Sequence, residues 1–258
     1  MTVPTALATL HLVIRLNLRN GVAACVEENP AVGPQQDEPM VRPIGNEPRL
    51  SRAGGGRLSL YLRQLEIMLK EGRQRVSSSQ LGEAIGVKDA QVRKDLATLG
   101  NLGQPGIGYD TADLTAAIRR MLGIDRDWRV ALVGVGNLAR ALLGYRGFLE
   151  RRFHVVALFD VATEKVGQPL NGIEVSPMSR MAEVLAETRA ELGVLAVPVE
   201  AAQDVANRLV AAGIRGLLNF APTVLRLPAH VRLVTVDLTV QLEQLAYLVQ
   251  TNQSPQSE

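Results

Sequence analysis

A run of apolar residues that leads into a glycine-rich turn constrains the fold of this chain more than any other feature. Residues 130–133 are all apolar, and Gly134, Gly136 and Ala139 follow at G-x-G-x-x-A spacing. A buried strand, such a turn and a helix together form the phosphate-binding unit of dinucleotide-binding domains. We expect Gly134 to make the tight turn, Gly136 to let a pyrophosphate approach the backbone, and Ala139 to allow close packing of the helix on the strand.

An acidic residue after the next apolar run narrows the choice of ligand. Asp160 ends a predicted strand at 155–159, where a carboxylate can accept hydrogen bonds from a ribose diol and would repel a 2′-phosphate. Val161 and Ala162 offer no arginine to bind that phosphate, so the sequence favours NAD(H) over NADP(H). Two alternatives stay open, namely a glycine turn that serves packing alone and a site for another nucleotide such as coenzyme A.

The chain beyond residue 128 alternates apolar runs with helical patterns. This alternation is typical of a parallel sheet covered on both faces by helices, as in Rossmann-like α/β domains. We expect strands at 130–133, 155–159, 192–197, 216–218 and 233–236, and helices at 137–143, 181–187 and 201–212. A final helix at 240–249 is strongly apolar, so we expect another surface to cover it.

Further ligand contacts are expected at the edge of the sheet where the glycine turn lies, because open parallel sheets bind ligands at the carboxyl ends of their strands. The loops after two later strands hold apolar surface suited to a nicotinamide ring. Besides the two glycines and Asp160, the predicted contacts are Val135, Asn137, Leu138, Ala139, Val197, Pro198 and Asn219.

Catalytic and metal-binding chemistry find little support in the sequence. The three histidines, His11, His154 and His230, stand beside no recognisable acid or nucleophile. Cys25 is the only cysteine, which excludes an internal disulfide and argues against a cysteine-rich metal site. We therefore expect no enzymatic activity and no metal. Arginines interrupt the apolar stretch near the amino terminus, which fails as a signal peptide or membrane span, so a cytoplasmic location is expected.

A helix-turn-helix pattern precedes the glycine turn. Leucines recur at helical spacing from 58 to 69, and the serines at 77–79 offer N-cap hydroxyls for a second helix that Gly86 ends. Asp89 is placed to cap a third helix at 90–99. Gly82 and Gly86 lack side chains where two such helices must cross closely.

The region with the helix-turn-helix pattern, residues 57–122, is called the head below. It is basic and carries a glycine-rich segment at 100–109, which is typical of the β-hairpin wing of a winged helix. Residues 49–100 contain ten Lys and Arg against five Asp and Glu, whereas residues 129–258 contain twelve of each kind. This asymmetry favours a polyanionic partner for the head. A fourth helix at 111–122 would connect the head to the second domain.

The helix-turn-helix supplies candidate DNA contacts. Arg93 and Lys94 on the third helix can reach bases or phosphates, and Gln91 suits a bidentate contact with adenine. Ser79 on the second helix is a further candidate. The competing interpretation is a solvated, charged helix face, and the wing tip at Gln104 and Pro105 carries no positive charge.

The segment before the head has a different composition. Residues 27–56 are rich in proline, glycine and charge and cannot bury enough apolar surface to become ordered. The expected organisation is therefore a disordered extension at 1–56, a winged-helix DNA-binding domain at 57–122, a Rossmann NAD(H)-binding domain at 128–238 and a carboxyl-terminal helix at 239–250.

Five segments together resemble the Rex family of redox-sensing transcriptional repressors. They are residues 91–96, 106–109, 132–139, 219–222 and 236–239. The resemblance covers about residues 57–249. It implies a homodimer with winged-helix heads, a Rossmann domain that binds NADH and NAD+, and a carboxyl-terminal helix swapped between subunits. It also implies that NADH releases the repressor from operator DNA, so that the protein reports the NADH/NAD+ ratio.

A redox signal must pass from the nucleotide to the DNA-binding head, and only a ligand with different affinity for two conformations can carry it. We hypothesise that Arg63, Tyr109 and Asp237 of the partner subunit form a polar link that depends on the bound state. Two other functions stay open at this point: an NAD-dependent oxidoreductase with an accessory head, and a nucleotide-binding interaction module with weakened DNA binding.

Overall fold

The computed structural model describes residues 51–251 of the 258-residue chain, so Cys25, His11 and most of the expected extension lie outside the described residues. Order begins earlier than the sequence predicts. Helix α1 (Arg52–Lys70) includes the glycine triplet at 54–56, which we expected to be disordered. The hydroxyl of Ser51 accepts a hydrogen bond from the backbone N–H of Gly54 at 3.1 Å, and this N-cap starts the helix before Arg57.

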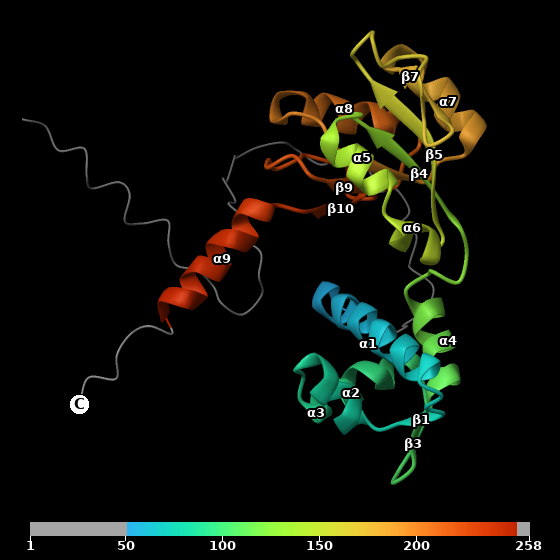
Figure 1. The fold of residues 1–258 in the computed structure, drawn as a ribbon, viewed down its shortest axis with the longest axis vertical. Coiled ribbons are helices and arrows are strands. Elements are labelled where there is room, and N and C mark those ends of the chain that lie inside the picture. The colour runs from blue at the N-terminus through green and yellow to red at the C-terminus, as the bar shows by residue number, and fades with distance from the viewer. Residues whose placement is uncertain (1–50, 252–258) are drawn as a thin grey trace, which may run out of the picture. The chain divides into compact units, whose positions relative to one another are not determined.

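The predicted winged helix is confirmed (Figure 1). Its helices are α1, α2 (Ser78–Ile85), α3 (Asp89–Leu96) and α4 (Thr111–Met121), with a short 3₁₀ turn, η1 (Ala97–Leu99). Strands β1 (Arg75–Val76), β2 (Gly103–Gln104) and β3 (Gly108–Asp110) form an antiparallel sheet in the order β1-β3-β2. The β2–β3 hairpin is the wing.

The predictions made for the serines at 77–79, Gly82, Gly86 and Asp89 of the helix-turn-helix are partly confirmed. Ser77 caps α2 in a reciprocal box with Gln80, and Gly86 ends the helix in the left-handed region with φ +70°. A Cβ on Gly82 would lie 2.3 Å from the carbonyl oxygen of Val87, so the tight approach expected there is real. At Gly86 the same atom would meet nothing within 4 Å, which means that this glycine serves the turn and not a helix crossing. Asp89 is the first residue of α3 rather than its cap.

The second domain contains a seven-stranded sheet in the order β10-β9-β8-β4-β5-β7-β6, which is parallel except for the β6–β7 pair (Figure 1). Its strands are β4 (Trp128–Val133), β5 (Phe153–Asp160), β6 (Pro169–Leu170), β7 (Ile173–Pro177), β8 (Leu192–Leu195), β9 (Gly216–Asn219) and β10 (Arg232–Thr235). Its helices are α5 (Asn137–Leu143), α6 (Arg146–Glu150), α7 (Met181–Thr188) and α8 (Val199–Ala211), with a 3₁₀ turn, η2 (Met178–Arg180). Helix α9 (Leu238–Thr251) follows the last strand.

The strand order reverses at β4, since the chain passes from β4 to β5 on one side and later places β8 on the other. In open α/β sheets such a reversal leaves a crevice outside the carboxyl ends of the strands, and ligands bind there. The predicted glycine turn follows β4 directly, so the fold puts it at this crevice.

Helices cover one face of the sheet fully and the other only in part. On the first face, Val133 and Phe159 pack with Val205 and Leu209 of α8 and with residues of α7. On the second face, α5 covers Leu132 and Leu158, but β8, β9 and β10 border an apolar hollow of about 420 Å³. Its apolar lining comprises Val130, Phe148, Phe153, Leu192, Val194, Leu217, Leu218 and Val234. Helices therefore lie on both faces of the sheet, as predicted, but within the described residues of one chain the second face is covered only in part.

Candidate nucleotide site and DNA-binding surface

The glycine turn has the geometry that a pyrophosphate site requires. Gly134 has φ +90°, and a Cβ there would lie 2.4 Å from the carbonyl oxygen of Ala196, so only glycine fits. Gly136 is exposed, and a Cβ on it would meet nothing within 4 Å, which leaves open space before α5. No side chain caps the N-terminus of that helix. Ala139 is fully buried beneath the turn, as close packing of the helix demands.

Asp160, the residue predicted to bind a ribose, shapes the turn through its hydrogen bonds. Its Oδ2 accepts hydrogen bonds from the backbone N–H of Val135 at 2.7 Å and from Lys165 Nζ at 3.0 Å, and its Oδ1 accepts from the N–H of Ala162 at 2.9 Å. Burial alone would raise the pKa of this carboxyl, but these three donors outweigh it and hold the pKa below its usual value. The residue is therefore ionised at neutral pH.

The register of the sheet brings the other predicted contacts to the same edge. Val133, Leu195 and Asn219 lie side by side on β4, β8 and β9, and Val197 packs against Gly134. Pro198 follows at the exposed start of α8. Val197 and Pro198 thus present apolar surface at the crevice.

Asn219 lies at the expected edge of the sheet, but its side-chain amide bonds to its own loop. It is fully buried, its Nδ2 donates to the carbonyl oxygens of Ala221 at 2.9 Å and Thr223 at 3.3 Å, and its Oδ1 accepts from the N–H of Ala221 at 2.9 Å. These hydrogen bonds use the amide group to hold the loop after β9. Asn219 therefore supports the ligand-facing surface instead of supplying a free polar group to it. Asn137 and Leu138 of α5 are exposed beside the turn.

The two described histidines lie away from this crevice. His154 is near the amino end of β5, where its Nε2 lies 3.0 Å from Asp127 Oδ1, and His230 is exposed in a loop. Hydrogen bonds from Arg152 and His154 hold the pKa of Asp127 at about 2. Across residues 51–251 there is no cluster of three or more His, Cys, Asp or Glu side chains arranged to hold a metal ion. No helix in that span is long and apolar enough to cross a bilayer.

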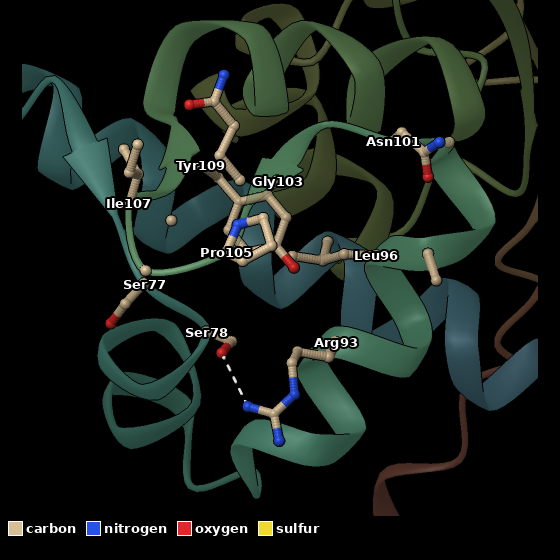
Figure 2. Close-up of a pocket in the computed structure, with 14 residues that line it drawn as sticks. Ser77, Ser78, Arg93, Leu96, Asn101, Gly103, Pro105, Ile107 and Tyr109 are labelled. Atoms are coloured by element: carbon tan, nitrogen blue, oxygen red, sulfur yellow. Dashed lines mark hydrogen bonds between the residues drawn. The ribbon is translucent and has the colours of Figure 1, made fainter.

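A groove of about 550 Å³ separates α3 and the start of α2 from the wing (Figure 2). Arg93 lines the groove on the helix-turn-helix side, where its Nη1 donates to Ser78 Oγ of α2 at 3.3 Å (Figure 2). The same Nη1 donates to Asp89 Oδ2 of α3 at 2.5 Å. Ser79 and Lys94 are exposed on α2 and α3. Three of the four predicted DNA contacts are therefore accessible on the helix-turn-helix.

Gln91 is the exception, because it belongs to a buried network that the sequence did not reveal. Asp95 is only 4% exposed and accepts hydrogen bonds from Arg57 Nε at 2.6 Å, Arg57 Nη2 at 2.8 Å, Tyr61 OH at 2.9 Å and Gln91 Nε2 at 2.8 Å. The network joins α3 to α1. It uses one of the two N–H donors of the half-buried Gln91 amide, and it neutralises Arg57, one of the charges that made the head basic.

The ionisation of this network follows from its contacts. The Arg57 guanidinium holds the pKa of Asp95 below its usual value despite burial, and burial together with the Asp95 charge raises the pKa of Tyr61 to about 12. Asp95 stays charged and Tyr61 stays neutral at physiological pH. A sequence signal existed in retrospect, since Asp95 falls on the inner face of α3 beside Val92 and Leu96, where an unpaired carboxylate would be costly.

Comparisons with known proteins agree with this arrangement. Residues 125–223 match a family model described as a CoA binding domain, and residues 49–97 match one described as a putative DNA-binding protein N-terminus. A redox-sensing transcriptional repressor Rex from Carboxydothermus hydrogenoformans is 46% identical over 77% of this chain and 96% of its own length. The chain belongs to the Rex family of redox-sensing transcriptional repressors. A Rex from Streptomyces coelicolor is 42% identical over 80% of each chain.

Solved structures of a Rex family repressor, RSP, share the fold. The complex of RSP with NAD+ and operator DNA matches with a TM-score of 0.76 and 33% identity over 79% of this chain and 94% of that one. The complex of RSP with NADH matches with a TM-score of 0.72 and 32% identity over 79% of this chain and 95% of that one. The chain is thus similar to a Rex protein along nearly the whole length of the latter.

Arg63, Tyr109 and Asp237, the residues of the hypothesised coupling link, lie on three different elements. Arg63 is exposed on α1, and Tyr109 is half-buried at the base of the wing with its ring over Gly103. Asp237 caps α9, its Oδ1 accepting from the N–H of Thr239 at 2.9 Å. Within residues 51–251 of one chain, Arg63 and Tyr109 are not joined by a hydrogen bond. The link to the partner subunit stays a prediction.

Proposed function

We propose that this protein is a transcriptional repressor that binds operator DNA through its winged helix and releases the DNA when NADH occupies the Rossmann domain. One observation supports the proposal most strongly. A single Rex family chain contains both a glycine turn with open space at Gly136 for a pyrophosphate and an open groove beside α3. RSP, the solved relative, is described in complex with NADH and in complex with NAD+ and operator DNA. Such a repressor acts where the chromosome lies, in the cytoplasm.

The proposal assigns a task to each part of the chain. DNA binding belongs to residues 57–122 together with the start of α1, through Ser79, Arg93, Lys94 and Gln91, whose hydrogen bond to Asp95 orients its amide. NAD(H) binding belongs to residues 128–238, through the glycine turn, Asp160, Val197 and Pro198. Residues 239–250 make the dimer.

Discrimination between the two redox forms requires no catalytic group. The oxidised nicotinamide ring carries a positive charge and the reduced ring does not. Burial beside apolar side chains such as Val197 and Pro198 costs the charged ring its hydration and therefore favours NADH. NADH then needs only a higher affinity for the conformation that does not fit DNA, because a ligand shifts an equilibrium by its difference in affinity for the two states.

Two apolar surfaces that one chain leaves uncovered support a homodimer. Every residue of α9 is exposed, including Leu242 at 66% and Leu245 at 56%. The hollow over β8, β9 and β10 is lined by apolar atoms. We propose that α9 of each subunit covers the hollow of its partner, because exposed apolar surface of this extent is costly in water and the two surfaces match in character.

The coupling link can be tested without loss of the helix cap. Asp237→Asn keeps a side chain that caps helices well but removes the charge. If Asp237 of the partner subunit pairs with Arg63 or Tyr109 in one state, this substitution changes the NADH sensitivity of DNA binding while α9 stays folded. Unchanged NADH sensitivity would refute the link.

DNA selected from a random pool by the protein itself provides the probe for the whole proposal. Binding of a fluorescent duplex is followed by anisotropy at fixed salt, with NADH, NAD+ or coenzyme A added at equal concentration. We expect salt-dependent DNA binding that NADH weakens and NAD+ and coenzyme A do not. No specific DNA, or equal effects of the three nucleotides, would contradict the proposal. Consumption of NADH with a small carbonyl substrate would support the oxidoreductase alternative.

A further inference from the structure

Lys165, which the sequence did not single out, lies beside the carboxylate assigned to the ribose. It stands in the turn after β5, where its backbone N–H donates to the carbonyl oxygen of Ala162 at 3.0 Å. Its Nζ lies 3.0 Å from Asp160 Oδ2. The Lys165 side chain is 32% exposed and that of Asp160 only 7%. The ammonium therefore lies at the mouth of the site, above a carboxylate that the turn holds in place.

The hydrogen bonds of Asp160 leave it too little capacity to hold a ribose diol alone. A carboxylate offers about four acceptor positions, two on each oxygen. On Oδ2 both are taken, by Val135 and Lys165, and on Oδ1 one is taken by Ala162. One position remains for a hydroxyl. Lys165 uses one of its three N–H donors on Asp160, so two remain to donate to ribose oxygens.

We propose that Asp160 and Lys165 form the ribose subsite together, and that Lys165 sets how well the protein discriminates NADH from NADPH. This inference rests on the proposed function and adds a residue that determines specificity. A lone carboxylate repels a 2′-phosphate strongly, but the Asp160–Lys165 pair has no net charge. The ammonium also offers the phosphate two donors. The site therefore rejects NADPH less strongly than the aspartate alone would imply, and Lys165 is the reason.

NADH and NADPH make a matched pair of probes, because they share the fluorescent reduced nicotinamide and differ only in the 2′-phosphate. The dissociation constants of both are measured by titration of the full-length protein. In Lys165→Met the NADPH/NADH ratio of dissociation constants should rise about tenfold or more, since one unit charge within a few ångströms of the phosphate is lost. Lys165→Arg should keep the wild-type ratio to within about threefold, because it keeps the cation.

Arg208→Met serves as the control for a general loss of charge. Arg208 lies on α8 in an exposed ion pair with Asp204 at 2.8 Å, and its substitution should leave the ratio unchanged. If Lys165→Met changes the ratio no more than Arg208→Met does, the assignment of Lys165 is wrong while the proposed function stands. If the wild-type protein binds no NADH at all, the proposed function itself fails and this inference falls with it.

Discussion

Removal of the Asp95 charge should loosen the recognition helix from the rest of the head. Asp95→Asn keeps the volume of the side chain but breaks the paired hydrogen bonds with Arg57. Removing one partner of a fully buried ion pair costs about 3–5 kcal/mol, and a hydrogen bond to a charged group contributes about 1.5–3 kcal/mol. Because the Arg57 side chain is 27% exposed and can regain some hydration, we expect a loss of about 2–4 kcal/mol in the stability of the winged helix.

Hydrogen exchange localises the effect. A loss of about 2–4 kcal/mol corresponds to protection factors that fall roughly 30- to 700-fold for slowly exchanging amides of α1 and α3, with β4 and β5 unchanged. Asp89→Asn is the matched control, since Asp89 lies on the same helix in an exposed pair with Arg93. It should leave protection in α1 nearly unchanged. Equal effects of the two substitutions would refute the idea that the buried network holds α3 in place.

The same network predicts how stability depends on pH. The folded pKa of Asp95 lies below its unfolded value, so the contribution of the ionised form is fully present above about pH 4 and is lost as the pH falls through the folded pKa. The stability difference between wild type and Asp95→Asn should therefore be constant near neutral pH and shrink in acid. A difference that grows below pH 4 would contradict this sign.

Five further substitutions test the glycine turn, the recognition helix and α9. Gly134→Ala should destabilise the Rossmann domain and abolish NADH binding, whereas Gly136→Ala, which meets open space, should leave thermal unfolding unchanged and weaken NADH binding at least tenfold; equal melting temperatures for the two would contradict the geometry of the turn. Arg93→Ala should lower the salt dependence of DNA binding by about one counterion, and an unchanged slope would exclude a phosphate contact. Leu242→Asp with Leu245→Asp should give monomers in sedimentation velocity experiments, and an intact dimer would place the interface elsewhere.

Elements with strong local signals could be predicted from the sequence. The helix at 137–143 was predicted with its observed bounds, because the strand, the glycine turn and the apolar face of α5 all indicate the same structure. The capping of α2 by Ser77 and its end at Gly86 follow from equally local chemistry. The carboxyl edge of the sheet could also be assembled in advance, because parallel strands place their following loops together.

Short and tertiary features could not be predicted. Helix α6 has only five residues with a glycine among them, and β6 is a two-residue edge strand that begins with Pro169, so neither shows a periodic pattern. The helical start at residues 52–56 was missed because three glycines have low helix propensity, and neither the Ser51 cap nor the continuity of this turn with the buried part of α1 was considered. The network around Asp95 joins residues from two helices. The place of Asp95 on the inner face of α3 indicates that its carboxylate needs a partner, but a single sequence does not show which residues of α1 supply it.

The predicted ligand contacts divide in the same way. Gly134, Gly136 and Asp160 were proposed from their spacing; the structure places them together at the turn after β4, and their contact with a ligand stays a prediction. Lys165 was missed because nothing in its sequence neighbourhood marks a turn that brings its ammonium back to Asp160. Asn219 was expected to contact ligand because of the strand end that it occupies, but its amide bonds to its own loop.

The reciprocal titration of NADH and operator DNA tests the proposed repressor function most directly. Thermodynamic linkage requires that saturating DNA weaken NADH binding by the same factor by which NADH weakens DNA binding, about 5- to 150-fold for a typical allosteric protein. We expect equal factors in the two directions for NADH and a much smaller factor for NAD+. An NADH affinity that DNA leaves unchanged would show that the Rossmann site and the winged helix are not coupled.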